Sequence, residues 1–121
     1  MDRGLLIVAH GSRANEAKNV VIEIVNKIQS LNKYKSVKAG FMEFDFPDIP
    51  LSIKQFVEEG IFDIIVAPLF LFEGMHIKVD IPSILKKEAE KYPGISIKFA
   101  RPIGYDDRII DILLSRIEEI I

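Results

Sequence analysis

The sequence predicts an α/β fold in which four parallel strands form one sheet in the order 2-1-3-4, with helices on both faces. Short apolar segments alternate strictly with longer segments whose apolar residues recur at helical spacing. The segment Ile64–Phe72 is uncharged and rich in β-branched and aromatic side chains, which is typical of a strand buried on both faces. Right-handed crossovers restrict the strand order, and 2-1-3-4 is the simplest doubly wound arrangement.

The first predicted strand and helix form the N-terminal part of the chain. Gly4–Ala9 is a short apolar segment and is predicted to be a strand, which His10-Gly-Ser-Arg13 ends. A helix is predicted over Ala14–Leu31, and Asn32-Lys33 closes it. The apolar residues of this helix share one face: Val20, Val21, Ile24, Val25, Ile28 and Leu31.

The second strand is predicted over Val37–Glu43, and the segment Phe44-Asp-Phe-Pro47 follows it. Asp48 is a suitable N-cap for the next helix, and Pro50 lies in the first turn of that helix. Gly60 ends the helix. One face of the helix is apolar and consists of Ile49, Ile53, Phe56 and Val57.

The third strand, Ile64–Phe72, is expected to lie in the centre of the sheet. Glu73-Gly74 ends the strand, so we expect His76 in a loop at its carboxyl end. Asp80 and Pro82 are expected to form the N-cap and first turn of the following helix. In open parallel sheets, ligands bind at the edge where the strands end.

The last strand and helix complete the pattern. Pro93-Gly94 ends the third helix, and Ile95–Ala100 is the fourth predicted strand, which Arg101-Pro-Ile-Gly104 ends. Asp106 is a suitable N-cap for the final helix. That helix is rich in apolar residues: Ile109, Ile110, Ile112, Leu113, Leu114, Ile117, Ile120 and Ile121. They exceed what one buried stripe requires, which weakly favours a partner surface.

Length and composition limit the possible functions. We expect a single domain over residues 1–121. The net charge of −2 gives no indication of a nucleic-acid partner. The sequence has no cysteine, which excludes disulfides and thiolate metal sites and fits a reducing compartment. We find no signal peptide and no membrane span, so we expect a cytoplasmic protein that does not contact membranes.

The only two histidines are predicted to meet at one edge of the sheet. His10 ends the first strand and His76 follows the third, and the predicted order makes these strands neighbours. Glu43 ends the second strand and is expected at the same edge. Two histidines with a carboxylate suit Zn²⁺, Co²⁺, Ni²⁺ or Fe²⁺. The pattern indicates a metal site, although the spacing is not that of a compact metal motif.

Each of these residues also has a purely structural interpretation. A histidine at a strand end is more often a hydrogen-bonded structural residue, and a carboxylate there is often only solvated. Five apolar side chains near this edge could line a cleft or pack in the core: Phe44, Phe46, Phe70, Phe72 and Met75. Arg13, Lys78 and Arg101 could bind anionic groups, and a solvated surface is an equal alternative for Lys78. The sequence has no P-loop and no Gly-x-Ser-x-Gly motif.

Several segments resemble the sirohydrochlorin cobaltochelatases. They are His10-Gly-Ser-Arg13, Phe41-Met-Glu-Phe44 with Pro47 and Pro50, the segment from Pro68 to Pro82, and Arg101-Pro-Ile-Gly104. The resemblance covers nearly the whole chain, whose length is that of the small archaeal form, equivalent to one half of the two-lobed chelatases. It implies a chelatase-like fold and the insertion of Co²⁺ (or Ni²⁺) into sirohydrochlorin in cobalamin, corrinoid or related tetrapyrrole biosynthesis.

The resemblance also implies roles for individual residues. His10 and His76 would be the catalytic and metal-binding histidines, with Glu43 as a further candidate ligand. The residues expected to contact the tetrapyrrole are Ser12, Arg13, Phe44, Phe72, Gly74, Met75 and Arg101. No cofactor is expected besides the metal ion that is inserted.

The resemblance to half of a two-lobed enzyme implies a homodimer, because one four-stranded domain offers only one wall for a broad macrocycle. Two such copies would share the cleft that holds sirohydrochlorin. Two alternatives stay open. The first is an iron chelatase that makes sirohaem, and the second is a non-catalytic carrier of a metal ion or a tetrapyrrole.

Overall fold

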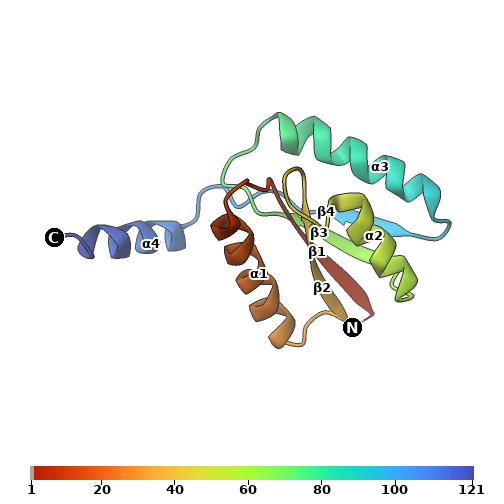
Figure 1. Cartoon of the computed structure of the whole chain (residues 1–121), viewed down its shortest axis with the longest axis horizontal. Coiled ribbons are helices and arrows are strands. Elements are labelled where there is room, and N and C mark those ends of the chain that lie inside the picture. The colour runs from red at the N-terminus through yellow and green to blue at the C-terminus, as the bar shows by residue number, and fades with distance from the viewer. Residues whose placement is uncertain (1) are drawn as a thin grey trace.

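The computed structural model describes residues 2–121 (Figure 1). Strands and helices alternate along the chain, as predicted. In order they are β1 (Arg3–Ala9), α1 (Asn15–Ser30), β2 (Ser36–Phe41), α2 (Ile49–Glu58), β3 (Asp63–Pro68), the π-helix η1 (His76–Asp80), α3 (Ile81–Lys91), β4 (Ser96–Phe99) and α4 (Asp107–Glu118).

The four strands form one parallel sheet in the order β2-β1-β3-β4, which confirms the predicted topology. Val8 of β1 pairs with Gly40 of β2 on one side and with Pro68 of β3 on the other. These three strands therefore end at the same edge of the sheet. The segments that follow them are brought together there, although they are far apart in the sequence.

Both faces of the sheet are apolar, because successive side chains of a strand point to opposite faces. Leu6 and Val8 of β1 pack with Ile53 and Phe56 of α2 and with residues of η1 and α3. Leu5, Ile7 and Ala9 of the same strand pack with Val21 and Val25 of α1. Helix α1 thus covers one face, and α2 and α3 cover the other (Figure 1).

Helix α2 begins as the sequence predicts. The carboxylate of Asp48 accepts a hydrogen bond from the backbone N–H of Leu51 at 2.9 Å, and Pro50 lies in the first turn. The fully buried hydroxyl of Ser52 donates to the carbonyl of Ala39 at 2.7 Å and so ties α2 to β2. This contact fixes α2 against the strand that leads to Glu43.

Two predictions about the third strand and the following loop are wrong. The regular strand β3 ends at Pro68 and does not continue to Phe72. Phe70 and Leu71 instead accept hydrogen bonds from Ile103 and Gly104 of the segment after β4. His76 does not lie in a loop, because it is the first residue of the π-helix η1, which continues directly into α3.

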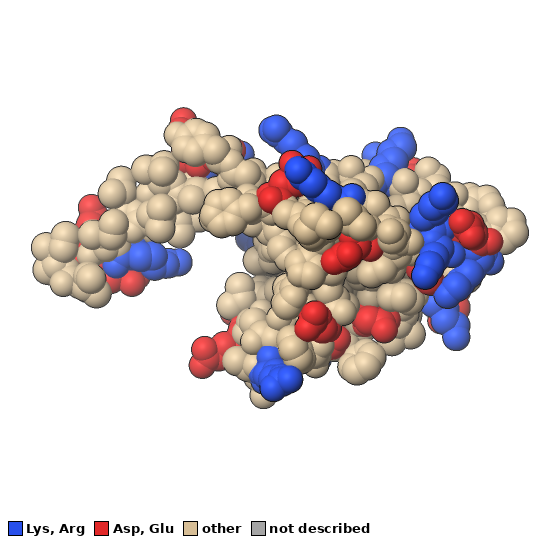
Figure 2. Space-filling view, turned by 90° about the horizontal axis from the view of Figure 1, so that it is seen from above, with Lys and Arg blue, Asp and Glu red and all other residues tan. Residues whose placement is uncertain are grey.

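Helix α4 differs from the other helices because none of its residues is buried. It extends away from the sheet as an arm (Figure 1). The face of this arm that Figure 2 shows is mostly uncharged, and a hollow separates the arm from the body of the molecule. The predicted N-cap of α4 is present, since the carboxylate of Asp106 accepts a hydrogen bond from the backbone N–H of Arg108 at 2.9 Å. Over residues 2–121, no helix combines the length and the apolar character needed to cross a membrane.

Candidate active site

The structure brings His10, Glu43 and His76 to the edge where β1, β2 and β3 end. The imidazole rings of His10 and His76 have centroids 5.1 Å apart and are tilted by 57°. Nε2 of His10 lies 3.7 Å from Oε1 of Glu43, which is too long for a hydrogen bond. The three side chains are each about half exposed, so a solute can reach them.

The loops that carry His10 and Glu43 are joined through their backbones. The N–H of Glu43 donates to the carbonyl of His10 at 3.0 Å, and the N–H of Ser12 donates to the carboxylate of Asp45 at 2.9 Å. Gly11 has a φ of +94°, and a Cβ at this position would lie 1.8 Å from the carbonyl oxygen of Glu43. Only glycine allows this approach, so Gly11 sets the spacing between His10 and Glu43.

Each imidazole has a hydrogen-bond partner on its Nδ1. Nδ1 of His10 lies 3.2 Å from the carbonyl oxygen of Gly11, and Nδ1 of His76 lies 2.9 Å from Oδ2 of Asp80. A carbonyl and an ionised carboxylate are acceptors, so Nδ1 is the donor in both neutral rings. Within the described part of the chain neither Nε2 forms a hydrogen bond, which leaves its lone pair free for a metal ion or a proton.

The spacing of His10 and Glu43 is close to that of two ligands of one ion. Two ligand atoms held about 2.1 Å from a tetrahedral ion lie roughly 3.4 Å apart. Over residues 2–121, however, no group of three or more histidine, cysteine, aspartate or glutamate side chains is arranged to hold a metal ion. The metal-ligand roles of His10, His76 and Glu43 therefore stay predictions.

The residues predicted to contact the substrate differ in their surroundings. The guanidinium of Arg13 lies 5.0 Å above the ring centre of Phe44, whose backbone has a φ of +67°. Phe72 and Met75 are 77 % and 68 % exposed, so both side chains are free to contact a ligand. The hydroxyl of Ser12 accepts the backbone N–H of Ala14 at 3.1 Å, which gives this residue a local structural role.

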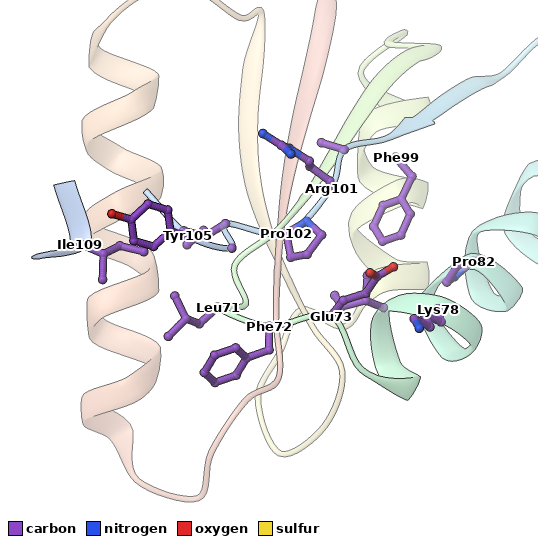
Figure 3. A pocket seen from close by; sticks show the side chains of 14 residues that line it. Leu71, Phe72, Glu73, Lys78, Pro82, Phe99, Arg101, Pro102, Tyr105 and Ile109 are labelled. Carbon is purple, nitrogen blue, oxygen red and sulfur yellow. The ribbon is translucent and has the colours of Figure 1, made fainter. Parts of the chain in front are cut away.

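An open pocket of about 1030 Å³ adjoins this site (Figure 3). Phe72 and Arg101 are among its lining residues, as is Lys78, and Gly74 is not. His10 and His76 do not line it, although Ile77 directly after His76 does. At the other end of the pocket, the hydroxyl of Tyr105 donates to Asp107 at 2.7 Å, and this bond raises the pKa of Tyr105 above its usual value.

Sequence reasoning missed three features of the site. It did not identify the steric role of Gly11, which depends on an approach between two loops that no local pattern reveals. It did not find Asp45, the acceptor for Ser12. It assigned Asp80 to an N-cap, but the carboxylate makes no capping bond and contacts His76 instead. The spacing of four residues between His76 and Asp80 would have indicated this contact on a helix.

The fold is a doubly wound sheet that carries two half-exposed imidazoles and a carboxylate at its carboxyl edge, where open α/β sheets bind ligands. The CbiX family model matches residues 4–120, and the chain belongs to this family. A sirohydrochlorin cobaltochelatase of Methanococcus maripaludis is 38 % identical, over 93 % of this chain and 95 % of that protein.

Two further relatives are longer than this chain. A sirohydrochlorin ferrochelatase of Priestia megaterium is 32 % identical over 95 % of this chain, but only 43 % of that protein is covered. The sirohydrochlorin chelatase SirB of Bacillus subtilis subspecies spizizenii, solved in complex with cobalt, is 29 % identical with a TM-score of 0.92. That match covers 99 % of this chain and 51 % of SirB, so this chain spans about half the length of SirB.

Proposed function

We propose that this protein is a sirohydrochlorin cobaltochelatase, which inserts Co²⁺ into sirohydrochlorin in the biosynthesis of cobalamin, other corrinoids or related tetrapyrroles. The observation that carries the proposal is the His10–His76 pair, whose rings lie 5.1 Å apart at the open edge of the sheet. Membership of the CbiX family and the similarity to a full-length cobaltochelatase of Methanococcus maripaludis support it.

The proposed reaction exchanges two protons for one metal ion. The ion enters the macrocycle as a substrate, and the two pyrrole N–H groups release their protons. The free Nε2 atoms of His10 and His76 hold the incoming ion or accept these protons, and imidazole performs both tasks near neutral pH. Glu43 lies close enough to His10 to act as a further ligand or proton acceptor. The proposal requires no cofactor besides the inserted ion.

The residues around the histidines suit a flat, anionic macrocycle. The exposed side chains of Phe44, Phe72 and Met75 offer apolar surface to the ring system. Arg13 and Arg101 pair with the peripheral carboxylates of sirohydrochlorin, since a guanidinium group can form bidentate hydrogen bonds with a carboxylate. In this assignment Ser12 and Gly74 contribute backbone rather than side-chain contacts.

The choice of metal is the finer part of the proposal. Imidazole and carboxylate donors suit Co²⁺, Ni²⁺ and Fe²⁺ alike, and binding strength alone follows the Irving–Williams order rather than the biological metal. We favour cobalt because the match covers 95 % of the Methanococcus maripaludis cobaltochelatase but only 43 % of the Priestia megaterium ferrochelatase. The ferrochelatase of Priestia megaterium keeps iron as the second candidate.

We also propose that the working unit is a homodimer in the cytoplasm. The match covers 99 % of this chain, helix α4 included, and 51 % of SirB, so about half of SirB lies outside the matched lobe. A second copy would take the place of that half and supply the other wall of the cleft. The lack of cysteine fits the reducing conditions of the cytoplasm.

Helix α4 supports the dimer because its apolar stripe is uncovered within one chain. Leu113, Leu114 and Ile117 are each about half exposed. A second uncovered surface lies on the face of the sheet that α1 covers. Helix α1 packs on β1 and β2, and the side chains of Ile65 and Ala67 in the neighbouring strand β3 stay partly exposed. Exchange of α4 between two copies would cover both surfaces, and a two-fold axis makes the two exchanges identical.

An assay with the purified protein tests the proposed activity. Sirohydrochlorin is mixed with Co²⁺, and the absorption spectrum is followed while the protein is present at a small fraction of the substrate concentration. We expect many equivalents of cobalt product for each active site. Formation of one equivalent and no more would identify a metal or tetrapyrrole carrier, and turnover with Fe²⁺ alone would identify an iron chelatase.

A further inference from the structure

Asp80 occupies the position of a helix N-cap without acting as one. It lies directly before α3, but its backbone is helical, with φ −68° and ψ −51°, and its side chain caps no backbone N–H. A capping aspartate has extended backbone and accepts a bond from the second or third residue of the helix, as Asp48 and Asp106 do here. The carboxylate of Asp80 is therefore available for another contact.

That contact is the bond to His76. Oδ2 of Asp80 lies 2.9 Å from Nδ1 of His76. Both residues belong to η1, in which the backbone N–H of Ile81 bonds to the carbonyl of His76, five residues earlier. Single π-helical turns of this kind are rare and occur frequently at functional sites. The turn brings the two ends of η1, His76 and Asp80, side by side.

The bond has a chemical consequence at the opposite nitrogen of the ring. An ionised carboxylate is only an acceptor, so Nδ1 of neutral His76 carries the proton and Nε2 carries the lone pair. His10 has the same tautomer, but its acceptor is the neutral carbonyl of Gly11 at the longer distance of 3.2 Å. The two histidines of the pair are therefore not equivalent.

We propose that Asp80 is a positioning residue that holds His76 with Nε2 unprotonated and turned toward the metal ion. This inference rests on the proposed function for its effect on cobalt insertion, but its effect on the His76 tautomer does not. Asp80 acts through His76, because its carboxylate holds Nδ1 of that imidazole at 2.9 Å.

The test compares Asp80→Ala and Asp80→Asn with the wild type, with Asp80→Glu as the conservative variant. The matched control is Glu90→Gln, which removes the charge of an exposed carboxylate elsewhere on α3. Imidazole ¹⁵N shifts are recorded for the metal-free proteins at about pH 8, where neutral imidazole dominates because its reference pKa is about 6.5. Co²⁺ binding without tetrapyrrole is followed by its visible spectrum, and kcat and KM are measured with sirohydrochlorin.

In the wild type and in Glu90→Gln, we expect the proton of His76 on Nδ1. In Asp80→Ala we expect it to shift largely to Nε2, with Co²⁺ affinity and kcat lower by about 10–100-fold and KM for sirohydrochlorin unchanged. Asp80→Asn keeps the shape of the side chain and loses its charge, and it should fall between wild type and Asp80→Ala. Asp80→Glu should recover part of the loss.

The outcomes separate this inference from the proposed function. If Asp80→Ala and Asp80→Asn, both folded by circular dichroism, keep the wild-type tautomer and Co²⁺ affinity, Asp80 is not a positioning residue, whatever the activity. If the wild type shows no turnover but Asp80→Ala shifts the tautomer and weakens Co²⁺ binding, the proposed function fails and the role of Asp80 stands. If Asp80→Ala does not fold, the same readings on Asp80→Asn decide the question.

Discussion

At the scale of single residues, the site depends on two histidines that different strands deliver to one place. His10 follows β1 and His76 begins η1, and β1 and β3 are hydrogen-bonded neighbours. Each ring is held by an acceptor on Nδ1, so the geometry of Nε2 is fixed before any ligand arrives. Such preorganisation reduces the cost of binding a metal ion in a productive position.

Replacement of His76 by alanine should abolish most of the activity and leave the fold intact. Removal of the proposed metal ligand and proton acceptor should lower kcat/KM by about 10²–10⁴-fold. The side chain is 45 % exposed, so the free energy of unfolding should change by only about 0.5 kcal/mol. Steady-state insertion and urea unfolding measure the two effects, with Lys87→Ala as a surface control on α3. Unchanged activity would remove His76 from the mechanism, and loss of folding would assign it a structural role.

Replacement of Gly11 by alanine should separate the loops that carry His10 and Glu43. The added Cβ would lie 1.8 Å from the carbonyl oxygen of Glu43, and the φ of +94° is unfavourable for alanine. We expect loss of most insertion activity and destabilisation by more than about 1 kcal/mol. Gly94→Ala is the control, because its φ of +85° is equally unfavourable but nothing lies within 4 Å. Equal activity in the two variants would show that the close approach at Gly11 is not required.

At the scale of secondary-structure elements, α2 and α4 illustrate opposite kinds of packing. Helix α2 is anchored on the sheet through Ile49, Ile53 and Phe56, all fully buried. Helix α4 has an apolar stripe of similar character and no buried residue. The first helix stabilises the fold of one chain, whereas the second leaves its apolar stripe uncovered within that chain.

The hydroxyl of Ser52 should contribute measurably to the stability of the monomer. It is fully buried and donates to the carbonyl of Ala39 at 2.7 Å. Ser52→Ala leaves this carbonyl without its donor, which should cost about 1–3 kcal/mol in the free energy of unfolding. Urea unfolding measures the change, and Ser83→Ala on the exposed side of α3 should change stability by only about 0.5 kcal/mol. Equal midpoints for the two variants would contradict this account of α2.

A charge on the apolar stripe of α4 should dissociate the proposed dimer. Leu113→Glu places a carboxylate where a partner surface is expected, and a buried, unpaired charge strongly opposes association. Ser115→Glu introduces the same charge on the polar side of α4 and should leave the dimer intact. Light scattering at micromolar concentration distinguishes dimer from monomer. An active wild-type monomer, or a Leu113→Glu dimer as stable as the control, would exclude the role given to α4.

At the scale of the whole molecule, the topology could be predicted because each strand and helix has a recognisable pattern in the local sequence. Apolar periodicity located the elements, and Asp48 and Asp106 marked two helix starts through their capping chemistry. Right-handed crossovers then gave the strand order, which placed His10 beside His76.

Features that depend on tertiary contacts could not be predicted in the same way. Strand β3 ends at Pro68, and beyond it Phe70 and Leu71 accept hydrogen bonds from the segment after β4, which lies about 30 residues further along the chain. The π-helical turn at His76 and the contact of Asp80 with it depend on backbone geometry that apolar periodicity does not report. The excess of apolar residues in α4 favoured a partner surface, but it did not predict that no residue of this helix is buried within the chain.

The central claim is that His10 and His76 of one chain act together on one metal ion, in a cleft shared by two chains. Mixed dimers test it most directly. A dimer of the wild type with His10→Ala/His76→Ala keeps one complete pair, and we predict substantial insertion activity. A dimer of His10→Ala with His76→Ala has no complete pair within either chain, and we predict almost none. Recovery of activity in this second dimer would show that the histidines cooperate across the interface and would contradict the account.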